Sequence, residues 1–278
     1  MENIDPYTIA MFRAEWTTFD QSSLSVSDLE SVFKLNFSVF PWQCVGPDSA
    51  GFDVGCGTGR WARFVAPQVG VLHCVEPDTE ILAVARANLR DLSNCRFHLA
   101  SANEMPFPDS SMDFGYAIGV FHYVPNPLEA LRACVRKLKV GAPILVNVYY
   151  ALDNRPSWFR FLWRVVDGIR RAVSWMPHRL VRVFAFAIAL LVYWPLARSA
   201  RIVEWLGADP SNVPLSGYRS RRFYTMRNDA LNRFGNRIEH RFTRKGLIDM
   251  MERAGLERVA VSEGPPYWSA VGYKRADV

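Results

Sequence analysis

The feature that most constrains the fold is a regular alternation of short apolar runs with longer amphipathic segments between residues 50 and 150. The short apolar runs predict strands at 50–55, 70–76, 95–100, 112–120 and 142–150. The segments between them predict helices at 60–66, 77–92 and 126–139, with Asp78 and Asn126 as the N-caps of the last two. Strands that alternate with helices pair in parallel, and the helices then cover both faces of the sheet. The pattern therefore predicts a doubly wound α/β fold.

The same alternation resumes near the C-terminus after a long interruption. A helix is expected from Thr243 to Gly255, followed by strands near 257–262 and 268–274 that a Gly-Pro-Pro turn joins. These two strands are close enough in sequence to form an antiparallel pair at the sheet edge. The expected fold is a Rossmann-like, seven-stranded, mostly parallel sheet with a C-terminal antiparallel strand and a largely helical insertion after the fifth strand.

Four segments follow from this organisation. They are an N-terminal helical cap, a Rossmann-like core, a helical arginine-rich lid or insertion, and a C-terminal helix with the last two strands, at 1–49, 50–150, 151–241 and 242–278. The chain carries a net charge of +6, but residues 151–242 hold 16 arginines, no lysine and six acidic residues. Arginine suits planar contact with phosphate or carboxylate, and it also suits a solvated face, so both interpretations stay open.

The cysteines and the N-terminus indicate a cellular location. The five cysteines are scattered and include no C-x-x-C pair, which argues for reduced thiols and against a disulfide framework or a zinc site. The N-terminus lacks the basic and apolar regions of a secretory signal. We therefore expect a cytoplasmic protein without a metal site, and peripheral contact with the inner face of the membrane stays open.

The stretch "GFDVGCGTGR" places three glycines at the end of the first predicted strand. A dinucleotide fingerprint is G-x-G-x-x-G, and its third glycine allows close packing of helix on strand. Here Gly55, Gly57 and Gly59 are spaced G-x-G-x-G, and Arg60 stands where the third glycine of that fingerprint belongs. Asp53, before the loop, is a poor neighbour for a diphosphate and a good one for an ammonium group. The loop therefore predicts a ligand without a diphosphate.

A second acidic residue lies where a ribose is usually recognised. Glu76 ends the second predicted strand, 21 residues after Gly55. A carboxylate there can accept hydrogen bonds from both ribose hydroxyls. A ligand with a ribose and an ammonium group but no phosphate fits both acids, and S-adenosylmethionine is such a ligand.

Four stretches in this chain resemble the successive motifs of a known family. They are "FDVGCGTGRWA", "VEPD", "MPFPDSSMDFGYAIGVFHYVPNP" and "ALRACVRKLKVGAPILV", and they resemble class I S-adenosylmethionine-dependent methyltransferases. The resemblance is closest to the small-molecule, type 11 group that includes the quinone-biosynthesis methyltransferases. It covers 50–150 strongly and 242–275 more loosely. It implies S-adenosylmethionine as cofactor and S-adenosylhomocysteine as product.

The resemblance also implies which residues bind the cofactor. The loop that ends at Gly59 is expected to wrap the methionine half, and Glu76 to hold the ribose hydroxyls. Ser101 stands where the family usually has an aspartate that reads the adenine amino group, and its hydroxyl can still accept one hydrogen bond. The predicted set is Asp53, Gly55, Cys56, Gly57, Gly59, Glu76, Pro77, Asp78, Ser101, Ala102, Asn103, Gly119 and Val120.

His122 is the predicted catalytic residue. It follows the fourth predicted strand, where the methyl group is expected to point, and an ordinary histidine pKa near 6.5 suits a general base at neutral pH. The family often has a histidine here that is only structural, and this alternative stays open. Tyr123, Tyr149 and Tyr150 also stand at predicted strand ends and are candidates for the lining of an acceptor pocket. No cluster of acidic residues argues for a metal-dependent transferase.

The segment 183–197 contains no charged residue. Its fifteen residues are short for a membrane span, and Pro195 is expected to interrupt its end. A single crossing would also separate the last two strands from their sheet, so we reject a true span. Three interpretations stay open: a buried lid helix or dimer contact, the wall of an acceptor pocket, and a helix in the membrane interface whose arginines contact headgroups, namely Arg179, Arg182, Arg198 and Arg201.

The sequence therefore predicts transfer of a methyl group from S-adenosylmethionine to a small-molecule or lipid- or sugar-linked acceptor, at oxygen. The alternatives are a nicotinamide-dependent oxidoreductase and a catalytically silent, membrane-associated module that binds S-adenosylmethionine. An anionic acceptor would suit the arginines and aromatic residues of 218–242, and RNA is a weaker alternative. DNA is not expected, because "GPPYW" at 264–268 resembles a DNA-methyltransferase motif but does not follow the fourth strand. A homodimer stays open.

Overall fold

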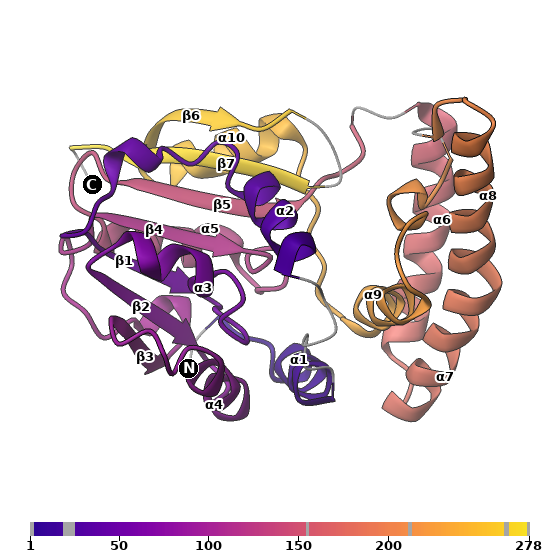
Figure 1. Ribbon diagram of the computed structural model, residues 1–278, viewed down its shortest axis with the longest axis horizontal. Coiled ribbons are helices and arrows are strands. Elements are labelled where there is room, and N and C mark those ends of the chain that lie inside the picture. The colour runs from indigo at the N-terminus through magenta and orange to yellow at the C-terminus, as the bar shows by residue number, and fades with distance from the viewer. Residues whose placement is uncertain (1–2, 19–25, 154–155, 211–212, 264–266, 277–278) are drawn as a thin grey trace. The chain divides into compact units, whose positions relative to one another are not determined.

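The computed structural model describes residues 3–18, 26–153, 156–210, 213–263 and 267–276. The chain forms two compact units, which we call the sheet unit, residues 1–154 with 238–278, and the helical unit, residues 155–237. The sheet unit holds one seven-stranded sheet in the order β3-β2-β1-β4-β5-β7-β6 (Figure 1). The predicted fold class is confirmed.

The first five strands are parallel, and β7 is antiparallel to both of its neighbours, β5 and β6. The strand bounds are β1 Ala50–Val54, β2 Val71–Glu76, β3 Cys95–Leu99, β4 Phe114–Ile118, β5 Pro143–Tyr149, β6 Leu256–Val261 and β7 Tyr267–Lys274. Because β7 inserts between β5 and β6, the last strand in the chain is not the edge strand. The Gly-Pro-Pro turn at 264–266 lies outside the described residues.

Three helices of the sheet unit begin at the polar caps that their sequences suggest. The side chain of Asp78 accepts hydrogen bonds from two backbone N–H groups of α4, that of Asn126 from Glu129 of α5, and that of Thr243 from Gly246 of α10. These helices are α4 Thr79–Asn88, α5 Pro127–Lys137 and α10 Arg244–Arg253. The predicted helix at 60–66 is shorter, since α3 is Ala62–Val65 and continues only as a 3-10 turn, η3 Ala66–Gln68.

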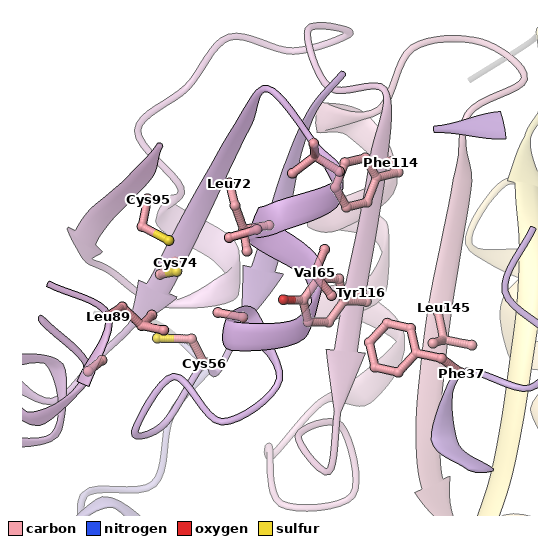
Figure 2. Packing of buried hydrophobic residues seen from close by; sticks show 14 of the residues in the cluster. Phe37, Cys56, Val65, Leu72, Cys74, Leu89, Cys95, Phe114, Tyr116 and Leu145 are labelled. Atoms are coloured by element: carbon pink, nitrogen blue, oxygen red, sulfur yellow. The ribbon is translucent and has the colours of Figure 1, made fainter. Parts of the chain in front are cut away.

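Two N-terminal helices, α1 Pro6–Thr18 and α2 Val26–Asn36, precede the sheet, with further 3-10 turns η2 Trp42–Cys44 and η4 Ala102–Glu104. Phe33 of α2 and Phe37, the residue after α2, pack into a core that joins α3 and α4 to the sheet. The Phe37 ring meets Tyr116 of β4 edge-on at 5.2 Å. Figure 2 shows Phe37, Tyr116 and Leu145 together in this core. The core also contains three of the five cysteines, all of which are free thiols.

Two glycines make room for two aromatic rings between β1 and β4. In the parallel register, Gly51 lies opposite Phe114, and Phe52 lies opposite Gly115. A methyl group built on Gly51 would overlap the Phe114 ring, and one built on Gly115 would overlap the Phe52 ring. Both rings are fully buried, so neither can move aside into solvent. This reciprocal packing holds β1 and β4 together, and the carboxyl ends of these two central strands contribute to the site described below.

We expect Gly115→Ala to destabilise the protein by about 1–3 kcal/mol, because the added methyl group overpacks a closed core. Gly46→Ala is the matched control, since a methyl group there has no neighbour within 4 Å. Urea unfolding followed by tryptophan fluorescence measures both variants. Equal stability of Gly115→Ala and the control would contradict the close approach of ring to glycine.

The helical unit is built from α6 Ser157–Ser174, α7 His178–Ile188, α8 Trp194–Trp205 and α9 Phe223–Gly235, with a 3-10 turn η7 Ser216–Tyr218. The expectation that Pro195 interrupts the apolar segment is wrong. A π-helical turn, η5 Ala189–Tyr193, joins α7 to α8 directly in front of this proline. The widened turn accommodates the missing N–H and the ring, so the helix continues through Pro195.

Within the described residues, Arg179–Trp205 is one helix of 27 residues that is long and apolar enough, by length and composition, to cross a membrane. Only 28% of its most apolar stretch of 18 residues is buried. The chain by itself therefore does not bury this helix, as the interpretation of a buried lid helix would require. The length argument against a span no longer holds. The argument from topology still excludes a single membrane crossing. Because β7 pairs with β5, the chain must return to the side of the membrane from which it left.

Candidate functional site

A pocket opens at the carboxyl ends of the parallel strands. This position is the usual one for ligands of such sheets. Residues that follow each of the first four strands line it: Val54, Gly55 and Gly57, then Glu76 and Pro77, then Ala100, Ser101 and Ala102, and finally Ile118, Gly119 and Val120.

The three loop glycines have different tasks. All three have positive φ, at +65° for Gly55, +55° for Gly57 and +79° for Gly59, which favours glycine at each. A methyl group on Gly55 would lie 2.6 Å from Val120, and one on Gly59 would lie 2.6 Å from Leu89, the residue after α4. Gly57 has open space in front of it and lines the pocket. Two glycines therefore allow close packing, and Gly57 leaves its backbone open to a ligand.

Glu76 joins this loop to the end of β2. Its Oε2 accepts a hydrogen bond from the Gly57 N–H at 3.1 Å, and its Oε1 accepts one from the Asp78 N–H at 3.3 Å. Burial raises the pKa of the Glu76 carboxyl to about 7, and these two hydrogen bonds offset that rise only in part. A carboxylate at the pocket wall with lone pairs still available can receive hydroxyl groups from a ligand.

Asp53 lies in β1 behind the loop and does not line the pocket. Burial raises the pKa of its carboxyl well above the usual range, and the Tyr116 hydroxyl beside it opposes that rise. Cys56, Gly59 and Asn103, from the predicted cofactor set, also stand outside the lining. The assignment of these residues to the cofactor stays a prediction.

Asp78 also lies outside the pocket lining, where it fastens α1 to the sheet unit. Its buried carboxylate caps α4 and forms an ion pair with Arg13 of α1 at 2.6 Å. The Arg60 guanidinium lies over the ring of Trp16, 5.1 Å from its centre, and over that of Trp61. Asp78 and Arg60 therefore both contact α1.

The helix α1 forms one wall of the pocket, and sequence reasoning missed it. Asp5, before Pro6 at the first helical position, accepts hydrogen bonds from the N–H and hydroxyl of Thr8. Thr8, Phe12 and Trp16 share one face and line the pocket. This i, i+4, i+8 spacing is the signal that could have been found. Ile4, Asp5 and Ile9 line it as well.

Ser101 lines the pocket and donates its hydroxyl hydrogen to Glu104 at 3.0 Å. Its oxygen keeps acceptor capacity, which an amino group of a ligand could use.

One of the three candidate tyrosines lies at the pocket, while Tyr149 and Tyr150 stand outside its lining. Tyr123 lines the pocket, and its hydroxyl donates to that of Tyr149 at 2.9 Å. His122 does not line the pocket; its ring stacks on Tyr149 with 4.0 Å between centroids. Burial, together with the positive charge of Arg241 and the neighbouring His240, holds the pKa of His122 well below its usual value. The imidazole is therefore neutral at neutral pH, and its role as base stays a prediction.

Comparison with known proteins shows which proteins this chain resembles. Residues 52–146 match the model of a family described as a methyltransferase domain. The chain is 32% identical over 112 residues to demethylmenaquinone methyltransferase of Listeria welshimeri, which covers 38% of this chain and 47% of that protein. It is 25% identical to the chloroplastic 2-methyl-6-phytyl-1,4-hydroquinone methyltransferase of Arabidopsis thaliana, over 48% of this chain and 40% of that one. The chain thus spans about half the length of the curated relatives it matches.

The fold also has a close counterpart among solved structures. A S-adenosylmethionine-dependent methyltransferase from Thermotoga maritima aligns over 96% of this chain and all of its own, with a TM-score of 0.54 and 15% identity. The predicted resemblance is confirmed, and the methyl donor of this family is S-adenosylmethionine.

The residues present fit this cofactor. The open face of Gly57 and the lone pairs of Glu76 lie on one wall, and the oxygen of Ser101 lies on the same pocket. Glu76 would hold the ribose hydroxyls, the glycine loop the amino-acid half, and Ser101 with Pro77 the adenine. Bound there, the cofactor supplies an activated methyl group.

Replacing Glu76 by glutamine tests the cost of its burial. The pKa of Glu76 is about 7 in the folded state and an ordinary 4.5 in the unfolded state, so between these pH values Glu76 keeps its proton only when the protein is folded. The contribution of Glu76 to the free energy of unfolding therefore falls by about 3 kcal/mol as the pH rises from 4.5 to 7. Glu76→Gln removes this fall and weakens binding of S-adenosylhomocysteine at least about tenfold.

Urea unfolding at about pH 5 and about pH 8, with titration calorimetry, measures both effects. Glu257→Gln, at an exposed position of β6, is the control. A variant with the same pH dependence as the native protein would contradict the raised pKa.

Replacing Arg13 tests the wall formed by α1. We expect Arg13→Gln to weaken binding of S-adenosylhomocysteine about fivefold, because α1 loses its ion pair with the buried Asp78. Hydrogen exchange in 6–18 is expected to rise in the variant. Lys34→Gln, which removes an exposed pair with Glu30, is the matched control. Unchanged affinity together with unchanged exchange would show that the ion pair does not hold α1 on the pocket.

Proposed function

We propose that this chain, which belongs to the class I S-adenosylmethionine-dependent methyltransferases, transfers the methyl group to an oxygen atom of a small, apolar acceptor that carries a lipid chain. The observation that carries the proposal is the continuity of one pocket, from the cofactor residues Gly57 and Glu76 to the phenol of Tyr123. Two relatives bear names that specify quinone or phytyl-hydroquinone acceptors, which supports a membrane-soluble ring compound.

The acceptor end of the pocket favours a hydroxyl group. The Tyr123 hydroxyl donates to Tyr149, and because a phenol oxygen can accept as well as donate, Tyr123 is our candidate partner for the hydroxyl of an acceptor. Transfer forms a carbon–oxygen bond, breaks the carbon–sulfur bond of the donor and releases the hydroxyl proton. Because the donor is already activated, the protein's main tasks are to align the acceptor and to remove this proton.

His122 acts on this end through Tyr149 in the proposed arrangement. Its neutral ring stacks on Tyr149, and the Arg241 guanidinium lies 5.3 Å from the centre of the Tyr149 ring. Arg241 in turn forms an ion pair with the buried Glu239 at 2.7 Å. This packing holds the Tyr149 hydroxyl against Tyr123, so His122 is a positioning residue in the proposal, whereas the sequence predicts it to be the base.

The activity is tested with methyl-labelled S-adenosylmethionine and a deproteinised extract of the cells that make this protein. We expect label in the organic phase after partition against water, and a loss of that label with Glu76→Ala. Label in the aqueous phase alone would contradict a lipid-linked acceptor and favour a sugar or other soluble metabolite. Binding of S-adenosylhomocysteine without any transfer would contradict the activity and favour a silent cofactor-binding module.

Once an acceptor is found, Tyr123→Phe is expected to lower kcat/KM about 10- to 100-fold, because the acceptor loses its hydrogen-bond partner. Tyr273→Phe, in β7, is the matched control. His122→Gln is expected to lower kcat less than Tyr123→Phe does and to leave the pH profile unchanged. A larger loss with an altered pH profile would make His122 the base, as the sequence predicts.

A further inference from the structure

The exposed hydrophobic side chains of this protein are concentrated in the helical unit. Among the described residues, large apolar side chains with high exposure occur in the sheet unit only at Leu35, Leu99 and Val140. The rest lie between Trp158 and Leu206, most of them on α6, α7, η5 and α8. A contiguous apolar surface of this kind on a folded chain marks a contact with another body.

The continuous helix Arg179–Trp205, which we call the α7–α8 helix, buries its small residues and exposes its large ones. The buried positions recur about every four residues and are mostly small: Val181, Ala185, Ala189, Tyr193, Ala197 and Ala200. The exposed positions include Val183 at 66%, Leu191 at 72% and Trp205 at 83%. A helix that faces water would gain more by burying leucine and tryptophan than by burying alanine. This inverted pattern suits a helix whose outer face contacts an apolar medium.

The covered side of the α7–α8 helix packs against α9. Phe184 meets Phe234 of α9, and the Tyr193 hydroxyl donates to Asp229 at 3.2 Å. On α6, the buried Arg170 donates to the Asn236 carbonyl after α9, and pairs with Asp167 at 2.7 Å. The covered faces of α6 and α7–α8 thus look toward the α9 segment (Figure 1).

The uncovered face of α6 continues the apolar surface. Its exposed apolar residues recur every three or four positions and so lie on one face of the helix. They are Trp158, Phe161, Leu162, Val165 and Ile169. The buried Asp167 and Arg170 lie on the other side of the same helix. The helical unit therefore has one polar, α9-covered side and an apolar side to which both long helices contribute.

Arginines accompany this apolar side. Residues 155–237 contain 15 arginines, no lysine and four acidic residues. Arg160, Arg164, Arg179, Arg182 and Arg201 are exposed, and in the described part of the chain none of them forms an ion pair with a carboxylate. Arginines beside an apolar face complement a partner with negative groups at its surface and an apolar layer beneath them.

We propose that the helical unit docks on an anionic membrane surface, with α6 and the α7–α8 helix lying in the interface. Exposed tryptophans at several points of these helices, Trp158, Trp175, Trp194 and Trp205, are the residue type enriched at such interfaces. The continuous helix is about 40 Å long, which is enough to cross. Both of its ends lead back to one sheet, and for this reason it lies in the plane.

A lipid surface fits these residues better than a second copy of the chain. Two copies joined through this face would bring two strongly positive rims together, which costs association energy. Anionic headgroups neutralise the same arginines. The docking goes beyond the methyl transfer proposed above and does not depend on it, so vesicle binding is measured without S-adenosylmethionine or acceptor.

Flotation of the full-length protein with vesicles tests the docking. We expect binding to vesicles of equal parts phosphatidylglycerol and phosphatidylcholine, much weaker binding to phosphatidylcholine alone, and a decrease with added salt. Val183→Asp and Leu191→Asp are each expected to lower the partition coefficient at least about tenfold. Val140→Asp, at a 60% exposed position of the sheet unit, is the matched control and leaves binding unchanged.

The charge contribution has its own pair of variants. Arg179→Gln and Arg182→Gln are each expected to lower partition into the anionic vesicles about fivefold. Arg90→Gln, an 80% exposed arginine of the sheet unit, leaves it unchanged. No binding of the native protein to anionic vesicles overturns the proposal, as does equal binding by the aspartate variants. A dimer by light scattering that Leu191→Asp dissociates, without vesicle binding, would show a second copy on this face.

Discussion

The site depends on one buried carboxylate. Glu76 stands at the end of β2 and accepts hydrogen bonds from the backbone of the glycine loop on one side and of the α4 entry on the other. It therefore holds two strand ends in register while it faces the pocket. Its burial raises its pKa to about 7, so the empty protein carries an unfavourable charge that a ligand with two hydroxyl groups would satisfy.

The remainder of the pocket is arranged around that group. Gly55 and Gly59 let the loop pack on Val120 and Leu89, Gly57 stays open, and α1 forms the opposite wall through Phe12 and Trp16. The helical unit differs, because its long helices expose large apolar residues. Several exposed arginines of its described part, such as Arg179 and Arg182, form no ion pair with a carboxylate. One chain thus combines a cofactor pocket in its sheet unit with a surface suited to lipid in its helical unit.

Much of the fold could be predicted because local rules decide it. The caps at Asp78 and Asn126 and the strand ends agree with the sequence, since cap chemistry and apolar runs act over a few residues. The wall made by α1 was missed because contact with the pocket is a property of the tertiary structure. Helix continuity through Pro195 was missed because a π-helical turn has no sequence rule as strong as the proline rule it overrides.

Titration calorimetry with S-adenosylhomocysteine and, separately, with a nicotinamide dinucleotide tests the central claim most directly. The structure puts the Glu76 carboxylate at the pocket, where it accepts a hydrogen bond from a loop whose glycine spacing does not suit a diphosphate. The account predicts one site per chain for S-adenosylhomocysteine and no heat from the dinucleotide. Binding of the dinucleotide, with no binding of S-adenosylhomocysteine, would contradict it.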